Sequence, residues 1–157
     1  NPMAFDPSTL SALTPLIAVI VSPAATLYVA KKQLQASVVS NNRQAWINRL
    51  RDEVASLTAF ILSLPSAHAA DSITTSAAMD MHANFVKMAQ SVKLLANPSE
   101  PDHQELIRLI DLANADIIRS INQRIANANQ FSTSAETIIN KTQTILKQEW
   151  IRVKQGK

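Results

Sequence analysis

The stretch PSTLSALTPLIAVIVSPAATLYVA, residues 7–30, decides the expected fold. It is a run of 24 residues without a charged side chain, between Asp6 and Lys31. A run of about 18 or more predominantly apolar residues can cross the hydrocarbon core of a bilayer as a helix. We therefore expect a transmembrane helix over residues 7–30. A buried helix of a soluble oligomer is one alternative. A cleaved signal peptide is another, although no Lys or Arg precedes the run.

The flanks of this stretch predict where the helix begins and how it is oriented. Asp6 followed by Pro7 is a favourable helix start, and membrane helices tolerate internal prolines such as Pro15 and Pro23. Lys31 and Lys32 follow the run directly, so the positive-inside rule places the N-terminus outside and the rest of the chain in the cytoplasm. We therefore expect a protein of the bacterial inner membrane.

One face of the expected span is rich in small residues. Ala18, Ser22 and Thr26 are each four positions apart, and Ser11 lies on the same face. Small residues at this spacing let two membrane helices approach closely. These four residues are our candidates for membrane-helix association, although Ala and Ser are also common in membrane helices that remain single.

Composition restricts the remainder of the chain to helices. The 157 residues include one glycine and no cysteine, and only 4% are aromatic. Phosphate-binding glycine loops and cysteine chemistry are therefore excluded, and sheets with many tight turns are unfavourable. The fold class predicted is all-α: an N-terminal transmembrane helix that continues into an antiparallel cytoplasmic four-helix bundle.

Apolar residues at alternating spacings of three and four predict the helices of this bundle. We expect the first helix to run from Pro7 to about Leu64, to form a stalk over residues 31–42 and to end at Pro65. The bundle would occupy residues 43–157, with further helices over residues 75–96 and 102–129 and a fourth that begins at a capping box, Thr133–Glu136. The seam of the first helix is Ile47, Leu50, Val54, Leu57, Ile61 and Leu64, and that of the fourth is Ile139, Thr142, Leu146, Trp150 and Val153.

Residues that could carry chemistry are few and scattered. The three histidines lie on different elements, and no nucleophile is paired with a base, so we expect no enzyme activity, metal or cofactor. The net charge of +3 comes without aromatic platforms, which makes nucleic acid an unfavourable partner. The basic residues near the expected membrane surface favour anionic lipid instead. They are Lys31, Lys32, Arg43, Lys154 and Lys157.

Two short motifs stand out, and short helix connections place them at the same height in an antiparallel bundle. They are W-x-N-x-L-R-x-E, residues 46–53, and E-W-x-R-V-K, residues 149–154. This combination resembles a group of uncharacterised small bacterial membrane proteins, and the layout is similar to membrane effectors of anti-phage systems. The motifs define a structural or interaction cluster: Trp46, Asn48, Arg51, Glu53, Glu149, Trp150 and Arg152. The structural interpretation packs both tryptophans in one core layer.

The function expected is that of a non-enzymatic, single-pass membrane protein whose bundle binds a partner or self-assembles. One version is a membrane-disrupting effector. The alternatives are a scaffold subunit that anchors a larger complex and a soluble helical oligomer that buries the N-terminal stretch.

Overall fold

The computed structural model describes residues 7–69, 74–123 and 127–155, with side chains from residue 26 onward except at 35–36 and 67–69. The described chain is all-α, as predicted. It forms four helices: α1 (Pro7–Ala69), α2 (Thr75–Leu95), α3 (Pro101–Gln123) and α4 (Ala128–Lys154).

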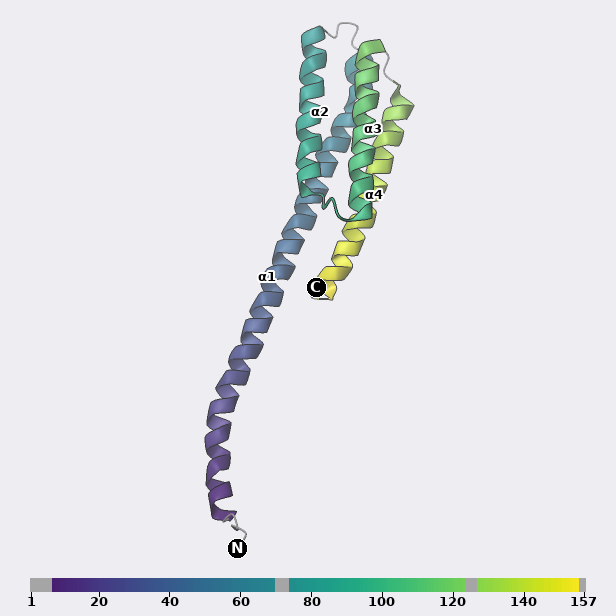
Figure 1. Cartoon of the computed structure of the whole chain (residues 1–157). Helices are drawn as coiled ribbons and strands as arrows, with labels where there is room; N and C mark the ends of the chain where they lie inside the picture. Colours follow the sequence, from purple (N-terminus) through teal and green to yellow (C-terminus); the bar gives the residue numbers. More distant parts are fainter. Residues whose placement is uncertain (1–6, 70–73, 124–126, 156–157) are drawn as a thin grey trace.

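The four helices form an antiparallel bundle in which each packs against two neighbours (Figure 1). Helix α1 contacts α2 and α4, and α3 contacts the same two helices from the other side. Backbone contacts between the diagonal pairs are absent in the described ranges, so the bundle is a square with the core along its axis. The α2–α3 turn lies at the lower end of the bundle, and α4 continues past this turn to the C-terminus (Figure 1).

The core consists of aliphatic side chains with two phenylalanines, Phe85 from α2 and Phe131 from α4. The predicted seam of α1 is confirmed at every position, since all six of its side chains are buried. Burial of these large apolar side chains stabilises the bundle, at roughly 1.5–3 kcal/mol for each one removed from water.

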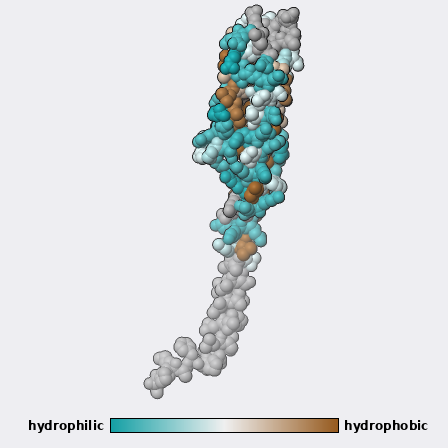
Figure 2. Space-filling model, turned by 90° about the vertical axis from the view of Figure 1, so that its right-hand side faces the viewer, coloured by the Kyte–Doolittle hydropathy of each residue, from teal (hydrophilic) through white to brown (hydrophobic). Residues whose placement is uncertain are grey.

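Helix α1 continues far below the bundle. It spans 63 residues and is about 95 Å long at 1.5 Å per residue. The prediction of one continuous helix is therefore confirmed, but its predicted end at Pro65 is wrong by one turn, because the helix continues to Ala69. Below the bundle, Figure 1 shows α1 alone, and brown hydrophobic atoms remain on the neck in Figure 2.

The predicted transmembrane span lies mostly outside the residues whose side chains are described. Ser11, Ala18 and Ser22 also lie outside them, whereas Thr26 is exposed on α1. Within the residues whose side chains are described, no helix is long and apolar enough to cross a membrane.

The predicted C-terminal end of α3 and the predicted start of α4 are wrong, whereas the predicted start of α3 is correct to within one residue. Helix α3 ends at Gln123, and α4 begins at Ala128, five residues before the predicted capping box. Asn127 is the N-cap, and its side-chain oxygen accepts from the backbone N–H of Gln130. Thr133 lies inside the helix and donates to the carbonyl of Asn129. The earlier start brings Phe131 into the core, where it is 2% exposed.

The buried face of α4 is rotated by one residue from the predicted seam. Thr142 is buried, as predicted. Beside it, Ile138, Ile145 and Glu149 are buried where the prediction had Ile139, Leu146 and Trp150. One residue corresponds to about 100° of rotation in a helix of 3.6 residues per turn. This rotation places a carboxylate in the lowest layer of the bundle.

Candidate functional site

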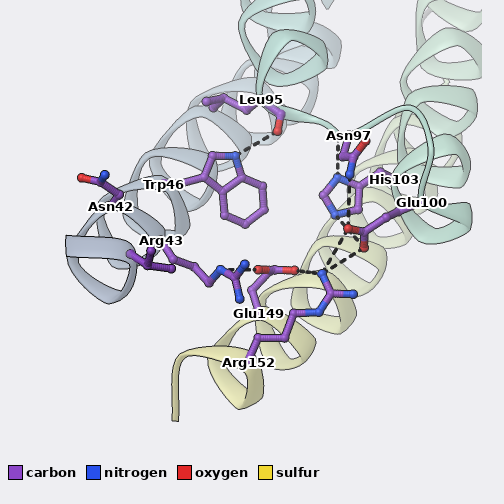
Figure 3. Close-up of a pocket in the computed structure, with 10 residues that line it drawn as sticks. Asn42, Arg43, Trp46, Leu95, Asn97, Glu100, His103, Glu149 and Arg152 are labelled. Carbon is purple, nitrogen blue, oxygen red and sulfur yellow. Dashed lines mark hydrogen bonds and ion pairs between the residues drawn. The ribbon is translucent and has the colours of Figure 1, made fainter. Parts of the chain in front are cut away.

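A pocket of about 390 Å³ opens at the lower end of the bundle, where α1 and α4 meet the α2–α3 turn (Figure 3). We call it the basal pocket. It is lined by Val39, Asn42, Arg43, Trp46, Leu95, Asn97, Glu100, His103, Glu149 and Arg152.

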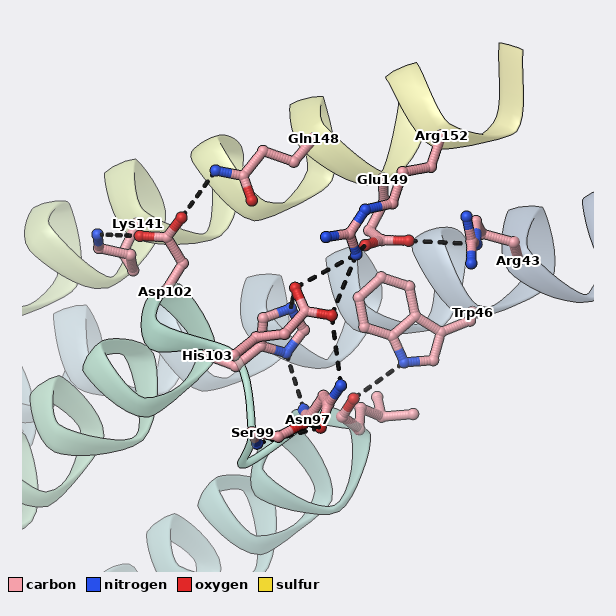
Figure 4. A network of polar contacts seen from close by, with 12 residues as sticks. Arg43, Trp46, Asn97, Ser99, Asp102, His103, Lys141, Gln148, Glu149 and Arg152 are labelled. Atoms are coloured by element: carbon pink, nitrogen blue, oxygen red, sulfur yellow. Dashed lines mark hydrogen bonds and ion pairs between the residues drawn. The ribbon is translucent and has the colours of Figure 1, made fainter. Parts of the chain in front are cut away.

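A series of alternating charges runs along one wall of the basal pocket and joins three elements (Figure 4). Arg43 of α1 pairs with Glu149 of α4, with Nε 3.2 Å from Oε2. Arg152, one turn further along α4, pairs with the same carboxylate and also donates to both oxygens of Glu100, at 3.1 and 3.3 Å. We call these four residues the basal ion chain.

The contact between Arg152 and Glu100 shifts the pKa of both groups. The hydrogen bond from Arg152 lowers the pKa of the Glu100 carboxyl below its ordinary value of 4.5. The same bond, with the charge of Glu149, raises the pKa of Arg152. Glu149 is 7% exposed, so its negative charge depends on the two arginines that flank it.

Trp46 and His103 form the apolar wall of the pocket. Their rings stack with centroids 5.8 Å apart and planes 17° from parallel. The indole Nε1 donates to the carbonyl of Leu95 at 2.9 Å, which satisfies one of the open carbonyls at the end of α2. The tryptophan of α1 therefore closes the C-terminus of one helix and covers the first turn of the next.

His103 fixes the α2–α3 turn from within. Its Nδ1 lies 2.8 Å from the backbone nitrogen of Asn97, which can only donate. Nδ1 is therefore the acceptor, and the ring proton of the neutral form lies on Nε2. Nε2 is 4.0 Å from Glu100, so this buried ring, 3% exposed, connects the turn with the basal ion chain.

A second polar contact attaches the start of α3 to α4. Asp102 accepts from Lys141 at 2.9 Å and from Gln148 at 2.7 Å (Figure 4). These bonds, that of Lys141 first, lower the pKa of the Asp102 carboxyl. The negative charge also lies in the first turn of α3, where the helix dipole favours it.

The structure brings together only part of the cluster expected from the two motifs. Trp46, Glu149 and Arg152 line the basal pocket. Asn48 lies on the exposed side of α1, where it accepts from Gln44 and Arg51. Glu53 is half-buried further up the same helix.

The prediction that Trp150 packs in the core layer is wrong. Trp150 is 45% exposed, and the ammonium group of Lys154 lies 5.4 Å from the centre of its ring. Trp46 does have an aromatic neighbour, but that neighbour is His103 from the start of α3.

The basic residues that were expected to contact anionic lipid differ in their surroundings. Lys31, Lys32 and Lys154 are exposed, and Lys157 lies outside the described residues. Arg43 instead points into the base of the bundle and pairs with Glu149 (Figure 3). Sequence reasoning missed His103 and Glu100, whose only signal was their position beside the Pro101 helix start.

The polar side chains of the basal pocket make hydrogen bonds and ion pairs that join α1, α4 and the α2–α3 turn. Across the described ranges, no buried side-chain nitrogen or oxygen lacks a hydrogen-bond partner, and no group of acidic or histidine side chains is arranged to hold a metal ion. The contacts of Arg43 and Trp46 with α4, Leu95 and His103 fix the point at which α1 leaves the bundle.

Comparisons with models of protein families, with curated proteins and with solved structures found no match to this chain.

Proposed function

We propose that this protein is a membrane-anchored, non-enzymatic helical bundle that works by association, with itself or with a protein partner. Residues 7–30 span the inner membrane with the N-terminus outside. The bundle lies in the cytoplasm, held by the stalk near anionic lipid.

The observation that carries this proposal is the length of α1 beyond its own bundle. Among the described residues, no other part of the chain covers the large apolar side chains on this part of the helix, with Leu27 71% and Tyr28 68% exposed. Both residues belong to the run of 24 uncharged residues at positions 7–30. A single helix with this surface is unfavourable in water and favourable in a bilayer.

The charges at the lower end of the chain support the same orientation. Lys31 and Lys32 are exposed directly after the apolar run, at the height of an inner-leaflet surface. Each such charge near anionic lipid contributes about 1 kcal/mol of attraction. Lys154, at the end of α4, is exposed as well.

Fractionation of the full chain expressed in bacteria tests the anchor. We expect the wild type to remain in the membrane pellet after alkaline carbonate extraction. Val19→Lys combined with Ile20→Lys should release it, because each lysine at the centre of a span costs about 2.5–3.5 kcal/mol. The matched control, Ala55→Lys with Ala59→Lys, adds the same charges to exposed positions of α1 in the bundle and should stay in the pellet. A wild type found in the soluble fraction would contradict the proposal.

Membrane permeability separates an effector from a scaffold. If association of the membrane helices disrupts the bilayer, induced expression should stop growth and admit a dye that intact cells exclude. Expression without any change in dye entry would overturn the effector version and leave a bundle that anchors a larger complex.

A further inference from the structure

The part of α1 below the bundle carries an apolar face of its own. Leu27, Leu34 and Val38 are 71%, 67% and 55% exposed. Their separations of seven and four residues place all three on one side of the helix. Contacts within the chain do not account for them, because the other helices pack higher on α1 (Figure 1).

These three residues belong to a long regular repeat, which we call the outer seam. Its positions alternate by three and four over five heptads, which is the spacing of a coiled-coil seam. The outer seam consists of Leu10, Leu13, Ile17, Ile20, Ala24, Leu27, Lys31, Leu34, Val38, Asn41 and Ala45. Only Lys31 and Asn41 interrupt its apolar character.

The outer seam faces away from the bundle. Val38 and the buried Ile47 are nine residues apart, which is two and a half turns, so they lie on opposite sides of α1. A partner helix can therefore lie along the outer seam without displacing α2 or α4.

We propose that the outer seam binds the α1 helix of a second copy, in parallel, as a two-stranded coiled coil below the bundles. The inference deepens the proposed function and rests on it for direction, because two copies anchored in one membrane must run the same way.

The sequence along the outer seam is compatible with a parallel pair of identical helices. In such a pair, each residue meets its own copy, so charges beside the seam would repel. The positions that flank the seam from residue 9 to residue 44 carry none. Lys31 and Asn41 lie in the seam itself, where an isolated polar residue sets register and oligomer number at some cost in stability. The lysine stem can pass along the apolar surface and keep its ammonium group in water.

The outer seam and the small-residue face are competing contacts. Ala18 lies nine residues before Leu27, again two and a half turns, and therefore on the opposite side of the helix. A two-stranded pair can use one face or the other.

Disulfide cross-linking of the full chain in membranes tests this choice cleanly, because the natural sequence has no cysteine. Leu34→Cys and Val38→Cys should each give a cross-linked dimer under mild oxidation, since equivalent positions meet in a parallel pair. Gln33→Cys, an exposed neighbour at almost the same height, is the matched control and should not. Adding Leu34→Asp to the Val38→Cys variant should abolish the dimer. Leu34→Ala should weaken dimerisation roughly tenfold or more, because two buried leucines are lost per dimer.

Three outcomes would overturn the outer-seam dimer. Cross-linking at Ser22→Cys without cross-linking at Leu34→Cys would assign the contact to the small-residue face. Equal cross-linking at Gln33→Cys and Leu34→Cys would indicate random collision, and no cross-linking at any of these positions would indicate single helices. Failure of the anchor is a separate result, because it appears as soluble protein in the fractionation, whether or not Leu34→Cys forms a dimer.

Discussion

At the scale of single residues, Glu149 determines how the base of the bundle is built. A buried carboxylate in the lowest layer would destabilise the fold if it were alone, and the arginines on either side remove that cost. The sequence pattern around it is ambiguous, because Ile138–Ile145–Glu149 and Ile139–Leu146–Trp150 both fit the helical period. Hydrophobicity favours burial of Ile139, Leu146 and Trp150, because this series contains no charged residue. The first series is found because Arg43 reaches Glu149 from a helix more than a hundred residues away in the chain, which no local pattern shows.

Glu149→Gln should therefore destabilise the bundle. The substitution keeps the shape of the side chain but leaves Arg43 and Arg152 without their shared anion. We expect a loss of about 1–3 kcal/mol, below the value for a fully buried pair because both arginines are partly exposed. Chemical denaturation measures it. Glu136→Gln, the same change at an exposed position of α4, should have almost no effect, and equal losses for the two variants would contradict a special role for Glu149.

At the scale of helices, the apolar periodicity of α1 and α2 correctly predicts that these helices exist and approximately where they lie in the sequence. The helix predicted over residues 75–96 is found at Thr75–Leu95, and all six seam positions of α1 are buried. The ends of α3 and α4 were less predictable, because several polar residues between 122 and 136 can start a helix. Burial of Phe131 favours the start at Asn127 over the more regular capping box, because the earlier start gains a large core side chain.

The two candidate caps can be compared directly. Asn127→Ala removes the acceptor for the backbone N–H of Gln130 and should lower the free energy of unfolding by about 1 kcal/mol. Thr133→Ala removes only a bond to a carbonyl that is already part of the helix, so we expect a change within about 0.5 kcal/mol. Thermal or urea unfolding followed by circular dichroism gives both values. A larger loss for Thr133→Ala would restore the predicted start of the helix.

At the scale of the whole molecule, the basal ion chain joins α1, α4 and the α2–α3 turn. The stability of this junction depends on pH. The pKa of Glu100 is lowered in the folded protein, so its ionised form stabilises the fold at pH values above its ordinary pKa of 4.5. This contribution is lost as the pH falls through the lowered pKa. The free-energy difference between wild type and Glu100→Gln should shrink as the pH falls below about 5, because the carboxyl then takes up a proton. A difference that is unchanged at about pH 3 would contradict the ion pair with Arg152.

The helical fold and the antiparallel order follow from composition and short connections, whereas the basal pocket does not. Its residues come from α1, α4 and the α2–α3 turn, and their contacts form only once the helices have packed. Trp46 shows how far the sequence alone can predict this pocket. The sequence marks it as important, but its partners, Leu95 and His103, belong to elements about 50 residues further along the chain.

The unbroken course of α1 has a mechanical consequence. One helix forms both a wall of the bundle and the segment below it, so a rotation of the bundle also moves this segment. The segment from Arg43 down to Pro7 is about 54 Å long, so a tilt of the bundle by about 10° displaces the N-terminal end of α1 by roughly 9 Å. This is almost the distance between the axes of two packed helices. In the dimer that we propose, a slight tilt of each bundle would therefore bring together or separate the distant ends of the two α1 helices without unfolding either one.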